Sequence, residues 1–157
     1  MTINEWIDKY EHGPANVRAA VAGLSDEQVK SFPVPGTWSI QQIVIHLADS
    51  DLIGADRLKR IVAMDNAVLQ SYDETQFTKS LHYHDQSLPD ALDLMEINSR
   101  QTARILRKLP EAAFARKGMH TEVGAISLAE MLQRIANHVD HHLKFIHQKR
   151  KLLLAAK

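Results

Sequence analysis

Helix-start signals recur along this chain and constrain its fold more than any other feature. In each of three capping boxes, a serine is followed three residues later by Gln or Glu. The serine oxygen accepts a hydrogen bond from the backbone of the new helix, and the Gln or Glu side chain bonds back to the cap. A fourth start is predicted at Ser87, where a Pro and an Asp suit the first helical turn. The three boxes are Ser25 with Gln28, Ser39 with Gln42, and Ser127 with Glu130.

Long helices are expected to follow three of these starts, ending near Asn66, Leu109 and Leu152. Another helix is predicted over residues 3–23, with residues 13–14 (Gly-Pro) as the place where it would break. Four long helices in sequence are typical of an all-α four-helix bundle. The length of 157 residues fits one domain that spans residues 1–157.

Two stretches have no helical pattern, residues 72–86 and residues 114–126. Both are predicted to be long ordered loops, which carry function more often than short connections do.

Charge and composition exclude several classes of function. Nineteen basic residues balance nineteen acidic ones, which argues against a nucleic-acid partner. The first residues have no apolar signal core, and no apolar run is long enough for a membrane span, so a cytoplasmic protein is expected. Because the chain has no cysteine, any transition metal must be held by imidazole, with or without carboxylate. Its nine histidines are therefore the candidate ligands.

The last predicted helix carries a pair of histidines on its apolar side. His138 and His142 are four residues apart, so their rings lie on one face and can share a metal, as in the zinc motif H-E-x-x-H. The Glu of that motif is missing here, which excludes the zinc-protease hypothesis. His141 turns away from the apolar stripe and is interpreted either as a flanking residue or as a residue that supports a metal ligand. The stripe consists of Leu128, Met131, Leu132, Ile135, Val139, His142 and Ile146.

A third candidate ligand lies on the helix that begins after Ser39. His46 is at one edge of its buried side, and Asp49 and Arg57 continue the same line. Asp49 could orient a ligand, or it could be a solvent-facing carboxylate. Arg57 could recognise a carboxylate or phosphate, or it could form a salt bridge within the bundle.

Buried histidines need partners, because an unsatisfied buried polar group costs roughly 1–3 kcal/mol. One metal ion would satisfy all three imidazoles together; hydrogen-bonded histidines at a polar end of the bundle are the alternative. Three nitrogen ligands would leave positions open for water, thiolate or substrate, which is typical of catalytic metals.

Several segments of this sequence resemble the DinB/YfiT-like superfamily. Residues 36–50 resemble its first metal-ligand helix, and residues 138–143 resemble its last one. Arg57, residues 72–74 and the loop around His120 are similar to the YfiT branch. The resemblance extends over roughly residues 12 to 150.

The resemblance implies a four-helix bundle of unusual connectivity, with a divalent ion such as nickel or zinc. The ligands map to His46, His138 and His142. It further implies a homodimer and a small-molecule substrate, and activities such as metal-dependent hydrolysis or transfer of a low-molecular-weight thiol (bacillithiol or mycothiol). Asp49 and His141 are the candidate catalytic residues beside the metal.

Arg57 and His120 are the candidate substrate contacts, although loop histidines are more often simply exposed.

Three hypotheses for the function follow: a metal-dependent enzyme, a metal- or ligand-binding stress-response protein without turnover, and a structural bundle. Metal content separates the third from the first two.

Overall fold

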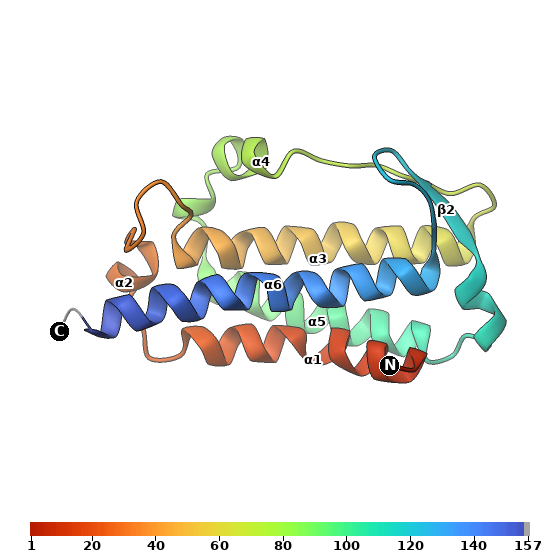
Figure 1. Cartoon of the computed structure of the whole chain (residues 1–157), viewed down its shortest axis with the longest axis horizontal. Helices are drawn as coiled ribbons and strands as arrows, with labels where there is room; N and C mark the ends of the chain where they lie inside the picture. Colours follow the sequence, from red (N-terminus) through yellow and green to blue (C-terminus); the bar gives the residue numbers. More distant parts are fainter. Residues whose placement is uncertain (156–157) are drawn as a thin grey trace.

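Four long helices form the framework of the computed structural model, which describes residues 1–155 (Figure 1). They are α1 (Ile3–Val21), α3 (Ile40–Ala63), α5 (Leu88–Leu106) and α6 (Leu128–Ala155). Both α1 and α3 pack against α5 and against α6, so α1 and α3 lie diagonally across the bundle. The predicted four-helix bundle is confirmed. No helix among residues 1–155 combines the length and the apolar character needed to cross a membrane.

The connectivity of the bundle places α3 beside α5 in the same direction. In Figure 1, α1 and α6 run one way and α3 and α5 run the other way. The chain must therefore return along the outside of the bundle between α3 and α5. This crossover, residues 64–87, contains β1 (Val68–Leu69), α4 (Glu74–Ser80) and the 3-10 turn η1 (Tyr83–Asp85).

The predicted helix starts are confirmed by their hydrogen bonds. At α3, the Gln42 N–H donates to Ser39 Oγ (3.2 Å), and the Ser39 N–H donates to Gln42 Oε1 (2.9 Å). The same reciprocal pair begins the short helix α2 (Asp26–Lys30) and α6. The predicted ends were wrong by about one turn, because α3 and α5 stop early and α6 continues further.

The break expected at residues 13–14 was wrong. Helix α1 continues through Pro14, with one backbone donor fewer. Packing explains why: a Cβ on Gly13 would lie 3.3 Å from Val139 of α6, so the missing side chain lets the two helices approach closely at this point. Tertiary contact thus holds together a helix that local propensity would end.

The two stretches predicted to be loops are more ordered than expected. Residues 72–86 contain α4 and η1, and residues 114–126 contain part of the 3-10 turn η2 (Glu111–Ala115) and most of a hairpin. The hairpin strands are β2 (Lys117–His120) and β3 (Gly124–Ser127), and β1 pairs in parallel with β2. The all-α framework therefore carries a small three-stranded sheet at one end.

A buried polar pair joins α3 to α5 between the apolar regions of the core. The Asn98 side-chain amide donates to the Asp51 carboxylate (2.6 Å), and both residues are buried. Burial raises the pKa of Asp51 to about 6, although the Asn98 hydrogen bond opposes this shift.

Removing the cap of α3 is expected to destabilise the protein modestly. Ser39→Ala should lower the free energy of unfolding by about 1 kcal/mol, because the Gln42 N–H loses its acceptor. Urea denaturation measures this loss. Ser39→Gly is the matched control and should cost only a few tenths of a kcal/mol. Equal stability of the alanine and wild-type proteins would contradict the role of the cap.

Candidate metal centre

Three histidines from two neighbouring helices converge on one point. The His138 Nε2 atom lies 3.3 Å from Nε2 of His46 and 3.0 Å from Nε2 of His142. One ring nitrogen from each of the three residues lies within 4.8 Å of the other two. His46 comes from α3, and His138 and His142 come from α6. We call these residues the histidine triad.

Local structure explains this convergence. His138 and His142 are one turn apart on α6, so their rings project from the same side. His46 is fully buried, and Trp38, just before the cap of α3, packs over two of the rings. The Trp38 ring is nearly parallel to that of His142 (7°), and its centroid lies 4.9 Å from the His46 ring.

Burial keeps the triad neutral. It lowers the pKa of His46 to about 3, of His138 to about 4 and of His142 to about 3. The charges of neighbouring histidines lower these values further, because two adjacent imidazolium ions repel each other. At neutral pH the three imidazoles are therefore unprotonated, which is the form that binds metal.

The donor set fits a divalent transition metal. The three Nε2 atoms face one another, and Nδ1 of His46 and of His142 is buried without a hydrogen-bond partner among the described residues. Neutral imidazoles cannot all satisfy one another in this arrangement, since each has one donor and one acceptor. A cation at the centre would accept all three lone pairs, and three nitrogens are a common set for such ions.

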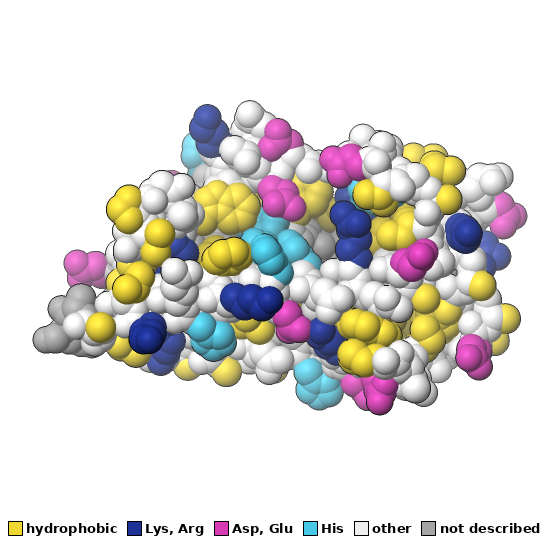
Figure 2. All heavy atoms as spheres, viewed as in Figure 1, with side chains coloured by type: hydrophobic (Ala, Val, Ile, Leu, Met, Phe, Trp, Pro, Cys, Tyr) yellow, Lys and Arg dark blue, Asp and Glu magenta, His cyan; other side chains and the backbone are white. Residues whose placement is uncertain are grey.

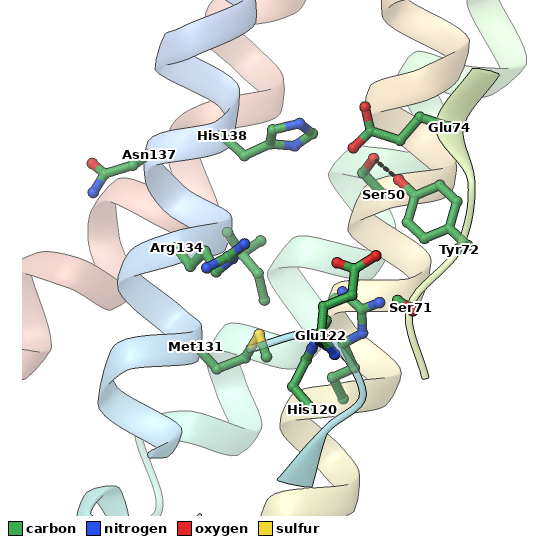
Figure 3. Close-up of a pocket in the computed structure, with 13 residues that line it drawn as sticks. Ser50, Ser71, Tyr72, Glu74, His120, Glu122, Met131, Arg134, Asn137 and His138 are labelled. Atoms are coloured by element: carbon green, nitrogen blue, oxygen red, sulfur yellow. Dashed lines mark hydrogen bonds between the residues drawn. The ribbon is translucent and has the colours of Figure 1, made fainter. Parts of the chain in front are cut away.

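Oxygen-bearing side chains lie on the open side of the triad. Glu74 Oε2 lies 4.0 Å from His46 Nε2, and Ser50 Oγ lies 3.4 Å from the same nitrogen. Ser50 and the Tyr72 hydroxyl share a hydrogen bond of 2.5 Å (Figure 3). Burial raises the pKa of both Tyr72 and Glu74. The sequence prediction included residues 72–74 only through the family resemblance and missed Ser50.

A cavity of about 470 Å³ adjoins the triad on this side. In Figure 3, α3 and α6 form two of its walls, and the segment carrying Tyr72 and Glu74 lies across from His138. Figure 2 shows the histidine cluster at the middle of this face, with an acidic side chain above it and basic side chains beside it. A second cavity, of about 300 Å³, lies on the other side of the triad and is lined by Trp38, Ile43, His142 and Phe145, among others.

The other predicted site residues occupy different positions. Asp49 accepts a hydrogen bond from the Tyr83 hydroxyl (2.5 Å), and burial and the Asp49 charge raise the pKa of Tyr83. His141 is exposed, and its ring meets the His142 ring edge-on at 5.2 Å. Arg57 and His120 both line the cavity beside the triad. No ion pair of Arg57 exists among residues 1–155, so the salt-bridge alternative is wrong.

The sequence matches a family and curated relatives over most of its length. The model of the DinB superfamily matches residues 9–146. The protein named "Putative metal-dependent hydrolase OB0782", of Oceanobacillus iheyensis, is 32% identical over 144 residues, which cover 92% of this chain and 83% of that relative.

Two solved structures share the fold. YfiT from Bacillus subtilis, described as "a probable metal-dependent hydrolase with an unusual four-helix bundle topology", superposes with a TM-score of 0.89 at 25% identity. That match covers 95% of this chain and 86% of YfiT. A mycothiol-dependent maleylpyruvate isomerase superposes with a TM-score of 0.73 at 11% identity, over 92% of this chain and 60% of the isomerase. The second likeness concerns the fold alone.

Proposed function

This chain belongs to the DinB superfamily, and from that membership we propose that it is a metal-dependent hydrolase of small carbonyl compounds such as esters or amides. One observation carries the proposal: three neutral imidazoles converge beside a carboxylate at the edge of a cavity that can admit a small molecule. Relatives named as metal-dependent hydrolases support the same class of reaction.

The triad would hold the ion. A divalent metal there would act as a Lewis acid that polarises a carbonyl oxygen and acidifies water. His46 and His142 are buried against Trp38, so the rings keep their positions whether or not a substrate is present.

Glu74 would serve as the general base. Its carboxylate is on the cavity side of His46, where it can take a proton from an attacking water molecule. Burial, and to a smaller extent the charge of Glu122, raise the pKa of Glu74, so this carboxylate binds a proton more readily than an ordinary one. The Tyr72 hydroxyl stays protonated, because burial raises its pKa, and it can donate to the oxygen that gains negative charge.

Glu74→Gln should separate the base from the metal. The expected result is a fall in kcat of about 100-fold, since a positioned base contributes at least that much, with metal content unchanged. Elemental analysis and kinetics on the same preparation measure both quantities. Glu122→Gln, which also lines the cavity, is the matched control and should retain most of the activity. Full activity of the Glu74 variant would exclude it as the base.

Metal-loaded protein tests the function itself. It should hydrolyse members of a panel of activated esters and amides without added thiol, and chelation should abolish turnover.

A thiol-dependent transferase is the second candidate. It is favoured by the second cavity, which reaches the triad from the Trp38 side and could hold a cosubstrate. Turnover only with an added low-molecular-weight thiol would establish that candidate. Full metal occupancy without any turnover, with or without added thiol, would indicate a binding protein.

A further inference from the structure

The cavity beside the triad contains two arginines from opposite walls. Arg57 extends from α3 and Arg134 from α6. Arg134 precedes His138 by four residues, about 6 Å along the helix axis, so it lies one turn from the triad. Gly54 lets α3 and α6 pack closely between the walls, since a Cβ there would lie 2.9 Å from Ile135 Cδ1.

Arg57 is held in place by contacts of its guanidinium group. One of its terminal amino groups donates to the carbonyl of Gln70, and its guanidinium lies 6.0 Å from the centre of the Tyr72 ring. Its Nε–H is buried without an acceptor in the part of the chain that the structure describes. Burial lowers the pKa of Arg57, and so does the charge of Arg134, whereas the charges of Tyr72, Glu122 and Asp56 oppose this shift. The positive charges of Arg57 and Arg134 therefore interact across the cavity.

Arg134 is exposed and makes no hydrogen bond or ion pair with any residue in the described range 1–155. Glu74 and Glu122 also line the cavity, and the charge of Glu122 acts on Arg57, but neither carboxylate forms an ion pair within 4.0 Å with either guanidinium among residues 1–155. Two arginines on opposite walls that form no direct ion pair can both donate hydrogen bonds to an anion placed between them.

His120 adds a hydrogen-bond donor to the same place. It is 5% exposed, and its Nδ1 accepts a hydrogen bond from the Glu122 backbone N–H (3.2 Å). The proton of the neutral ring must therefore be on Nε2, which bonds to no other described residue. Burial and the charges of Arg57 and Arg134 lower the pKa of His120, so the ring stays neutral.

We propose that Arg57 and Arg134, with His120 beside them, form a subsite for an anionic group of the substrate, a carboxylate or a phosphate. The proposal deepens the proposed function, because it defines the substrate as an anion whose reacting bond lies toward the triad. Arg57 and Arg134 bind the charged end, and their positions fix which bond reaches Glu74. Binding at this subsite does not depend on the reaction that follows.

A titration with matched small probes tests the subsite. Benzoate, phenylphosphonate and the neutral benzamide are added to the full chain supplied with one equivalent of zinc, and amide chemical shifts are followed by NMR. Benzoate or phenylphosphonate should bind in the millimolar range and shift the amides of Gly54, His120 and Arg134, whereas benzamide should not. Tighter binding of benzoate would indicate a carboxylate, and tighter binding of phenylphosphonate would indicate a phosphate.

Variants identify the residues responsible. Arg134→Gln should weaken binding of the anionic probe at least tenfold, and Arg57→Gln should do the same. Because Arg134 is exposed and unpaired, its variant should fold even if the Arg57 variant does not. Arg100→Gln, an exposed arginine of α5, is the control and should bind the probe like the wild type.

Two results would overturn the subsite: binding of benzamide as tight as that of benzoate, or unchanged anion binding by the Arg134 variant. If the metal-loaded protein hydrolyses neutral esters but binds neither anion, the subsite is wrong and the hydrolase proposal stands. Anion binding that depends on both arginines, without hydrolysis of any compound, would support the subsite and contradict the hydrolase.

Discussion

His142→Ala should reduce the metal affinity of the protein by a factor on the order of 10³ or more. The variant removes one of three nitrogen ligands, and even loss of a residue that only supports a ligand typically costs 10–100-fold. Only the imidazoles of His46 and His138 would remain as ligands, and water could enter the space left by the His142 ring. Elemental analysis after dialysis, together with a competition titration against a chromophoric chelator, measures the effect. Turnover should fall to the level of the chelated wild type.

Two variants serve as controls for this experiment. His147→Ala removes an exposed histidine from the same helix, and metal content should not change. Asp49→Asn should retain nearly all of the metal, because the Asp49 carboxylate bonds to Tyr83. A stoichiometric amount of tightly bound metal in the His142 variant would contradict the assignment of the triad as the ligand set.

The metal-free protein should lose stability steeply as the pH falls from about 6.5 to about 4. Burial lowers the pKa values of His46, His138 and His142 to between about 3 and about 4, whereas the unfolded chain protonates each of them near pH 6.5. In this range the unfolded state binds up to three more protons than the folded state, so acid favours unfolding.

Asp51 opposes this trend in the lower part of the range. Its pKa is raised to about 6, so the folded state binds one proton that the unfolded state releases above about pH 4. The net excess of about two protons amounts to roughly 5 kcal/mol over two pH units. This loss is comparable to the whole stability of many small domains.

Chemical denaturation of the metal-free protein at several pH values measures this slope. A variant with His46, His138 and His142 replaced by Gln has no group of depressed pKa in the triad, and its stability should fall much less between pH 6.5 and 4.5. Parallel pH profiles of the two proteins would exclude the triad as the cause of acid instability.

The helices could be predicted from the sequence because their signals are local. A capping box such as Ser39 with Gln42 spans one turn, and the structure forms it as predicted. The pairing of His138 with His142 is equally local, since helical geometry alone places their rings on one side. The length of each helix was less predictable, because packing against neighbours decides where the last turn frays.

The parts that could not be predicted depend on contacts between distant segments. Strand β1 has only two residues and pairs with β2 about fifty positions later, so no local pattern marks it. Position 74 lies next to His46 only because the crossover returns along α3, and the sequence around Glu74 contains no signal of that path. Arg134 was missed for the same reason, since a single exposed arginine on a helix resembles any solvated side chain.

The crossover and the hairpin have a consequence for how this protein can diversify. Two long helices supply the triad and the floor of the cavity, whereas segments outside the bundle supply Tyr72, Glu74 and His120. Length changes in residues 64–87, or replacement of the hairpin, would reshape what the cavity admits without moving the three imidazoles. Directed evolution that changes only the uncharged part of the substrate should therefore concentrate its accepted substitutions in these two segments, with Arg57, Arg134 and the rest of the bundle unchanged.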